Sequence, residues 1–354
     1  HAAYEDLRAA LARAAGARPD RVVIHCVHQH DAPFLNVEAL KYLRIPETFG
    51  WWPAIVKTCA AAAGAAAGTW KPVAAVGSAA TRVNGYASNR RIAMPNGRVA
   101  VRLSRCADET LRNAPVGAID PWLRTVAFRG RDGDILASLS FYATHPQVAN
   151  TRDKFSADAP GEAMRLLGGR PGTNLFFTGC GGNVAAGKYS TPDVEANLRH
   201  FGKKLADAIA GNLDAMRWED PGRLDWRSAA FEFPRRPLDR RALLNRLAVN
   251  PEDTAAAALL AVMDRGGDLP YVLSRLNIGT TSIFFLPGEL FVEYQLFLQS
   301  LHPDGSVAVA ANCRDDFYYC PLAADLETTG GYETDSFCYA GREFEARFKA
   351  AARD

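Results

Sequence analysis

The sequence predicts a mixed α/β fold (mixed α+β layers) built from helices and strands. Segments with the 3.6-residue spacing of amphipathic helices, such as residues 192–213, alternate with short apolar runs typical of buried strands, such as residues 173–178. No internal repeat and no linker interrupts this alternation. We therefore expect residues 1–354 to form a single layered domain whose functional site lies where strand ends converge.

The N-terminal half is expected to begin with a helix that ends at the turn residues Gly16 and Pro19. An apolar strand follows over residues 21–30, "RVVIHCVHQH", and strand alternation would put His28 and His30 on one face. Strand patterns on both sides of an Arg-Asp-Gly-Asp turn predict a hairpin over residues 122–147. The other elements expected here are a helix over residues 53–68, a strand over 74–83 and an arginine-rich loop over 84–98.

The C-terminal half continues the same mixture of elements. Helices are expected over residues 158–169, 192–213 and 288–303, and strands over 173–178, 224–233, 280–286 and 306–313. The segment from about residue 235 to 270 contains two charged helical runs. We expect this segment to be a helical cap inserted over the site.

Composition excludes several classes of protein. The 41 basic and 39 acidic residues give a net charge of +2, so no basic surplus points to nucleic acid as a partner. No stretch is apolar and long enough for a transmembrane segment, and the absence of a visible signal peptide favours a cytoplasmic location over export. The seven cysteines form no CxxC pair, which argues against a zinc ribbon or a thioredoxin-like site. The sequence leaves a homo-oligomer open.

Polar side chains follow the ends of several predicted strands. Histidines follow two of these strands, and the other ends carry a glutamate after Pro-Gly, an asparagine in a glycine turn and two adjacent tyrosines. Because sites in layered α/β proteins form where strand ends converge, we expect these side chains to share one site. They are His28, His30, His145, Asn183, Glu289, Tyr318 and Tyr319.

His28, His145 and Glu289 offer two neutral nitrogens and one carboxylate, the ligands that catalytic zinc prefers. A tyrosine hydroxyl beside them could also bind a cation. Each residue has a structural alternative: the histidines as a satisfied pair or a turn cap, Glu289 as a helix cap, and the tyrosines as packing at a core edge. Their spacing in the sequence does not by itself bring them together.

A family resemblance does link these motifs. The fragments "HQHDAPF", "SNRR", "GAIDP", "FYATHP", "FSADAPGEA", "FFTGCGGNV", "LPGELF" and "DDFYYCPLAADLETTGGYE" occur in the order seen in neutral (non-lysosomal) ceramidases and their bacterial relatives. The chain resembles the catalytic domain of this family from about residue 10 to 340. These enzymes are zinc amidases that cleave the N-acyl bond of ceramide. The resemblance therefore implies a ceramidase-like fold, one Zn2+ ion and hydrolysis of an amide or other acyl bond.

The resemblance also implies roles for individual residues. His28, His145, Glu289 and Tyr319 match the metal ligands, although the adjacent Tyr318 leaves the tyrosine register open by one residue. The matched catalytic residues are His30 as a proton acceptor, Arg90 as a group that polarises the carbonyl, and Tyr332 as a donor to the developing oxyanion. The residues expected to bind substrate or to support the site from behind are Asn89, Asp158 and Asn183.

The chain departs from the family at the nucleophile. Ala185 stands where ceramidases have a serine, and Asn183 replaces an aspartate in the same motif. The chain also ends at Asp354 without the immunoglobulin-like domain of long ceramidases, as expected of a short bacterial relative. We therefore expect metal-activated water to attack a small-molecule amide or acyl substrate that is more polar than ceramide. Two alternatives stay open: a zinc-dependent lyase or isomerase, and a non-catalytic metal-binding relative.

Overall fold

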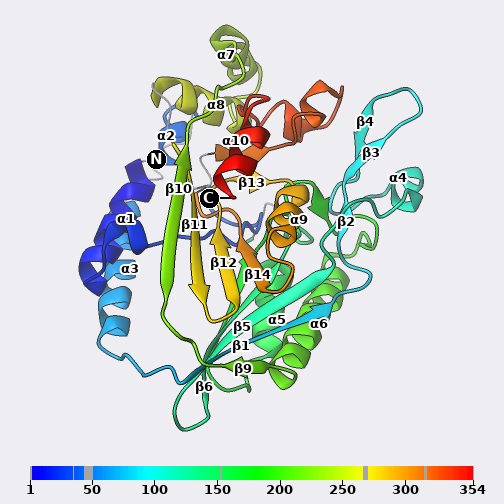
Figure 1. Ribbon diagram of the computed structural model, residues 1–354. Helices are drawn as coiled ribbons and strands as arrows, with labels where there is room; N and C mark the ends of the chain where they lie inside the picture. The colour runs from blue at the N-terminus through cyan, green and yellow to red at the C-terminus, as the bar shows by residue number, and fades with distance from the viewer. Residues whose placement is uncertain are drawn as a thin grey trace.

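The computed structural model describes residues 2–34, 36–43, 51–151, 154–265, 270–314 and 317–353. Two β-sheets lie face to face, and helices cover the outer face of each (Figure 1). The five-stranded sheet has the order β7 (Thr173–Thr178), β6 (Ile135–Tyr142), β5 (Trp122–Arg129), β1 (Ala75–Arg82), β9 (Arg217–Glu219). The four-stranded sheet has the order β10 (Asp225–Phe231), β11 (Tyr271–Ile278), β12 (Thr281–Phe285), β14 (Ser306–Ala310). The chain thus has the mixed α/β layers that its sequence predicts.

The main helices form the two outer layers. The five-stranded sheet is covered by α5 (Asp158–Leu166) and α6 (Val194–Asp214), and the four-stranded sheet by α9 (Val292–Ser300) and α10 (Phe344–Ala351). The remaining helices are α1 (Ala2–Ala15), α2 (Val37–Leu40), α3 (Trp52–Ala67), α4 (Glu109–Asn113), α7 (Arg240–Val249) and α8 (Thr254–Arg265), with 3-10 turns η1 (Pro19–Arg21), η3 (Asp325–Glu327) and η4 (Tyr332–Thr334). No helix in the described residues is long and apolar enough to cross a membrane.

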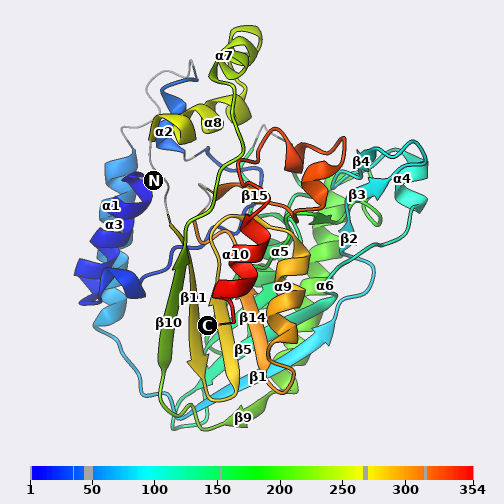
Figure 2. The same cartoon turned by 45° about the horizontal axis from the view of Figure 1, so that its top comes forward.

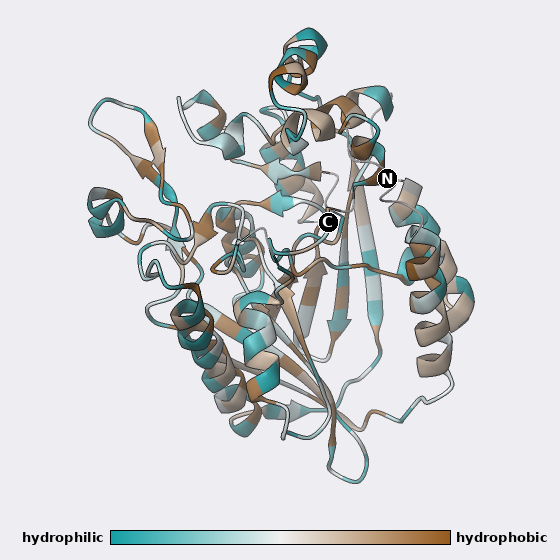
Figure 3. Ribbon diagram, turned by 180° about the vertical axis from the view of Figure 1, so that it is seen from behind, coloured by the Kyte–Doolittle hydropathy of each residue, from teal (hydrophilic) through white to brown (hydrophobic). Residues whose placement is uncertain are grey.

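Alternating side chains build a separate core on each side of a sheet. Ile283 of β12 and Ala308 of β14 point between the sheets and pack with Phe141 of β6. The next residue along β12, Phe284, lies in the core under α9 and α10. Colouring by hydropathy shows apolar residues along the strands, whereas the outer helices carry polar residues on their solvent side (Figure 3). This double-sided burial explains why the strands read as apolar runs.

Helix α6 shows how the sequence specifies an outer layer. The Asp193 side chain accepts a hydrogen bond from the Ala196 N–H at 3.0 Å and so caps the first turn. Phe201, Leu205 and Ile209 follow at helical spacing and are fully buried on one face. This face packs on β1 and β5.

Three short strand pairs lie outside the two main sheets. They are β13 (Glu289–Leu290) with β15 (Tyr319–Cys320), β2 (Ser88–Asn89) with β8 (Val184–Ala185), and β3 (Arg91–Ala93) with β4 (Val99–Val101). Strands β6 and β7 run parallel, as do β12 and β14. His145 follows the carboxyl end of β6, and Glu289 follows that of β12. The segments after these strands meet beside β15, which Figure 2 labels: Glu289 pairs with Tyr319 there and lies 3.3 Å from His145.

The structure corrects three element predictions. Residues 22–29 form no strand, because their hydrogen bonds go to loop and side-chain groups: the Cys26 N–H to Asn312 O and the Thr178 hydroxyl to Val27 O. The predicted loop over 84–98 contains the β3 strand and the start of a hairpin with β4. The helix predicted over 288–303 begins only at Val292, because Glu289 and Leu290 pair with β15.

The segment predicted as a cap does contain two helices, α7 and α8, between β10 and β11 (Figure 1). Residues 266–269 of this segment lie outside the described residues. Helix α8 packs against α2, where Asp264 pairs with Lys41 at 2.5 Å. Helix α2 follows the histidine motif in the chain, and the function of the insertion as a cap stays a prediction.

Candidate metal centre

The unusual backbone conformation at His28 orients its side chain toward the other candidate metal ligands. His28 has a φ of 71°, in the left-handed region that non-glycine residues rarely adopt. The preceding residues are held in place by the Thr178 N–H, which donates to His25 Nε2 at 3.1 Å. Strand alternation therefore does not explain why His28 and His30 are close, although their ring centroids lie only 5.0 Å apart.

His145 presents a lone pair to the site. Its Nδ1 lies 2.7 Å from the carbonyl oxygen of Gly181. Because a carbonyl can only accept, Nδ1 carries the proton, and Nε2 of the neutral ring carries the lone pair. Burial, together with the nearby Arg90, lowers the pKa of His145 to about 4 and so favours this neutral form.

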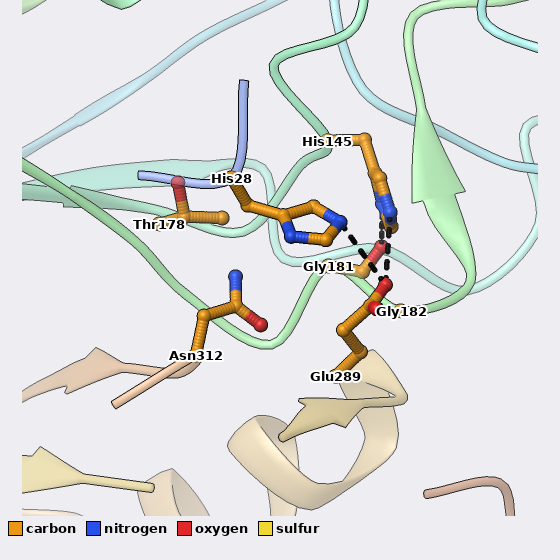
Figure 4. Close-up of a pocket in the computed structure, with 7 residues that line it drawn as sticks. All are labelled: His28, His145, Thr178, Gly181, Gly182, Glu289 and Asn312. Carbon is orange, nitrogen blue, oxygen red and sulfur yellow. Dashed lines mark hydrogen bonds and ion pairs between the residues drawn. The ribbon is translucent and has the colours of Figure 1, made fainter. Parts of the chain in front are cut away.

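Glu289 lies between two histidines. Its Oε2 is 3.2 Å from His28 Nε2 and 3.3 Å from His145 Nε2 (Figure 4). Gly288 makes the preceding turn with a φ of 78°, which a residue with a side chain would adopt only under strain. Burial alone would raise the pKa of Glu289, but the two histidines lower it overall, so the carboxylate is ionised.

Tyr319, not Tyr318, belongs to this cluster. The Tyr319 hydroxyl lies 3.3 Å from His145 Nε2, whereas the Tyr318 hydroxyl accepts a hydrogen bond from Asn36 Nδ2 at 2.6 Å. The pairing of β15 with β13 places Tyr319 opposite Glu289. Burial raises the pKa of Tyr319 well above its usual value, although the neighbouring Arg90 opposes this shift, and so keeps the phenol protonated.

Arg90 adds a fully buried positive charge. Its Nη2 donates to the Tyr319 hydroxyl at 2.8 Å and to Gly182 O at 2.6 Å, and its Nε lies 2.9 Å from Glu333. Glu333 is 0% exposed and also pairs with Arg91 at 3.1 Å. Sequence reasoning missed Glu333, which directly follows Tyr332 in "GGYE". A buried arginine needs a carboxylate partner, and nothing local in the sequence identified it.

His30 and Tyr332 lie next to the candidate metal ligands. Ring nitrogens of His28, His30 and His145 lie within 4.8 Å of one another. Gln147, which sequence reasoning also missed, has its Nε2 3.0 Å from His30 Nδ1. The Tyr332 ring lies 5.8 Å from that of Tyr319 and 5.1 Å from the Arg90 guanidinium.

Asn89, Asp158 and Asn183 support the site from behind. Asp158 accepts hydrogen bonds from backbone N–H groups, including that of Ala149 at 2.8 Å, and so holds the loop after His145. Asn183 accepts from the Val292 N–H at 2.8 Å at the start of α9. Both ends of the Asn89 side chain bond to backbone groups, at Arg91 N and Ala118 O. Of the two roles expected for these residues, their hydrogen bonds favour support over substrate binding.

Three of the candidate ligands, His28, His145 and Glu289, line a small pocket (Figure 4). Close backbone packing forms its floor: a Cβ on Gly182 would lie 2.5 Å from Glu289 O. Ala185 is buried in β8, and the hydroxyl of its partner Ser88 donates to Ala185 O at 2.9 Å, so neither offers a nucleophile. The residues that line the pocket are His28, His145, Thr178, Gly181, Gly182, Glu289 and Asn312.

Solved structures share this arrangement of layers. Neutral ceramidase from Pseudomonas aeruginosa matches the chain with a TM-score of 0.71 and 16% identity, over 99% of this chain and 63% of that one. The chain has a neutral ceramidase-like fold. A ceramidase complexed with C2 matches with a TM-score of 0.71 and 15% identity, over 99% of this chain and 64% of that one. The ceramidase-like chain thus spans just under two thirds of the length of these ceramidases. No protein-family model and no curated protein sequence matches it.

Proposed function

We propose that this chain is a zinc-dependent hydrolase of an amide or other acyl bond. One Zn2+ ion would be held by His28, His145, Glu289 and Tyr319. The observation that carries the proposal is the contact between His145 Nε2 and Glu289 Oε2 at 3.3 Å. A neutral imidazole offers a lone pair here and the carboxylate is an acceptor, so either a proton or a metal ion between the two atoms would complete the contact, and we propose the metal ion.

The distances among the four candidate ligands fit a zinc ion. Atoms that bind one zinc ion at about 2.0–2.2 Å lie roughly 3–3.6 Å from their nearest neighbours in the ligand set. Glu289 Oε2 lies 3.2 Å from His28 and 3.3 Å from His145, and the Tyr319 hydroxyl lies 3.3 Å from His145. These three separations are short enough for the atoms to share one ion, and a further coordination position would remain for water. The Gly181 carbonyl on His145 Nδ1 is the kind of outer partner that orients a zinc-bound histidine.

Bound zinc would lower the pKa of a water molecule and polarise a carbonyl group. Two residues of the chain would stabilise the negative charge that develops on the carbonyl oxygen. Burial alone would lower the pKa of Arg90, but Glu333 and the neighbouring tyrosines raise it overall, so its charge is permanent and can stabilise a developing oxyanion. Burial raises the pKa of Tyr332, so its hydroxyl stays protonated and can donate to the same oxygen.

The absence of a serine at position 185 supports attack by water and a substrate other than ceramide. An alanine side chain cannot form an acyl-enzyme, so the proposed reaction has no covalent enzyme intermediate. A small-molecule amide is the substrate class that the ceramidase-like fold and the charged, largely polar site favour together.

The test is metal content by elemental analysis together with turnover of a panel of N-acyl amides and esters. The proteins to compare are wild type, His28→Ala, Glu289→Gln and, as a matched control, His200→Ala on the outer helix α6. We expect about one zinc per chain in wild type and control, with zinc and activity lost in the two site variants. Zinc with products of elimination or isomerisation would favour the lyase or isomerase, and zinc without turnover the non-catalytic alternative. No bound zinc after reconstitution would reject the proposal.

A further inference from the structure

Gln147 and Ser104 form a hydrogen-bonded chain that ends on His30. The Ser104 hydroxyl donates to Gln147 Oε1 at 2.7 Å, and Gln147 Nε2 lies 3.0 Å from His30 Nδ1. The oxygen of the Gln147 amide is thus engaged by a hydroxyl, and its nitrogen is the group that reaches the ring. An amide nitrogen can only donate, so His30 Nδ1 is the acceptor of this bond.

This contact decides which nitrogen of His30 carries the proton. In a neutral ring that accepts at Nδ1, the proton is on Nε2. That Nε2 atom is buried and has no hydrogen-bond partner among the described residues. A buried N–H without a partner is costly, and its position beside the candidate metal ligands points to an oxygen of a bound molecule as the missing acceptor.

His145, in the same cluster, has the opposite tautomer. Its Nδ1 donates to Gly181 O at 2.7 Å, so its Nε2 presents a lone pair. The ring centroids of His30 and His145 lie 5.8 Å apart. The hydrogen-bond partners of the two rings thus fix different tautomers. The Gly181 carbonyl leaves a lone pair on His145 Nε2, and the Gln147 amide nitrogen leaves a proton on His30 Nε2.

We infer that Gln147 is a positioning residue that holds His30 as the Nε2–H tautomer, so that His30 donates a hydrogen bond to an acceptor oxygen of the substrate. The substrate role rests on the proposed function, whereas the tautomer does not require a metal. This role differs from the proton acceptor that the sequence motif suggests for His30. It also indicates that the substrate places an oxygen atom, either carbonyl or carboxylate, beside this N–H.

The tautomer can be measured directly in metal-free protein labelled with 15N-histidine. Long-range 1H–15N correlation spectra at neutral pH distinguish the two tautomers, and a His30→Asn variant assigns the signals. The variants are Gln147→Glu, which can only accept from the ring, and Gln147→Met, which removes the donor at similar size. Asn174→Asp is the charge-matched control: Asn174 lies in β7, its side-chain oxygen accepts from the Ser138 hydroxyl of β6 at 2.6 Å, and it does not line the pocket.

We expect the Nε2–H tautomer of His30 in wild type and in Asn174→Asp, and a proton on Nδ1 in Gln147→Glu. A lone pair freed at Nε2 should also tighten zinc binding of Gln147→Glu by about tenfold or more in chelator competition. A proton on Nδ1 in wild type, or an unchanged tautomer in both Gln147 variants, would overturn the inference. If the tautomers behave as expected but no protein binds zinc, the proposed function fails while the positioning role of Gln147 stands.

Discussion

Removing the charge of Glu333 should destabilise the protein and disorder Arg90. The Glu333 carboxylate pairs with two arginines: one oxygen lies 2.9 Å from Arg90 Nε and the other 3.1 Å from Arg91 Nη1. Glu333→Gln removes this negative charge from both. Arg91 keeps Asp325 at 3.3 Å, whereas Arg90 keeps only neutral partners among its hydrogen bonds. The cost of the substitution therefore falls mainly on Arg90.

The burial of the pair sets the magnitude. The Arg90 side chain is 1% exposed and that of Glu333 is 0% exposed, so water does not replace the lost carboxylate. Breaking a buried ion pair by removing one partner costs about 3–5 kcal/mol, and the remaining amide oxygen of glutamine favours the lower end of that range. With an unfolding entropy of about 2.1 cal/mol/K per residue, the 354 residues give roughly 0.7 kcal/mol/K, so 3 kcal/mol lowers Tm by about 4 °C.

Calorimetry of metal-free protein measures this effect without a contribution from zinc binding. Asp207→Asn is the matched control, because it breaks an exposed pair with Lys203 at 2.7 Å and should leave Tm unchanged. Turnover should fall in Glu333→Gln while zinc content is retained, since neither Glu333 nor Arg90 is a candidate ligand. A decrease in Tm no larger than that of Asp207→Asn would refute the claim that Arg90 depends on this buried carboxylate.

Two further outcomes follow from buried polar groups. Burial lowers the pKa of His25 from 6.5 to about 4, so between these values the unfolded chain binds a proton that the native state does not. The free energy of unfolding should therefore fall by on the order of 3 kcal/mol as pH drops from about 6.5 to 4. Urea unfolding of His25→Asn over the same pH range should show a correspondingly smaller decrease. Equal pH profiles for the wild type and this variant would contradict the prediction. Asp158→Ala should cost about 2–4 kcal/mol, because the N–H groups of Val148 and Ala149 lose their acceptor. Urea unfolding measures this cost, and Asp158→Asn, which keeps one acceptor oxygen, should lose less.

The layered fold could be predicted from the sequence because its elements follow from local patterns. Helix α6 has its cap at Asp193 and its apolar spacing within one segment, and the hairpin of β5 and β6 has its turn between two apolar runs. The segment 22–29 has the same apolar alternation but forms no strand. A strand requires a neighbouring backbone to complete its ladder, and the residues around 25 and 27 instead bond to Thr178.

The sequence by itself determined the chemical inventory of the site: three histidines and a glutamate after predicted strand ends, a tyrosine pair and, through the family resemblance, an alanine where a nucleophile would stand. Only the tertiary structure decided which of these groups meet. The parallel pairing of β13 with β15 selects Tyr319 over Tyr318. Glu333, the partner of Arg90 and Arg91, lies 242 residues after Arg91 in the chain, and Gln147 lies 117 residues after its partner His30. Hydrogen bonds and ion pairs act over about 3 Å, so contacts between such distant segments depend on how the layers pack and not on any local pattern.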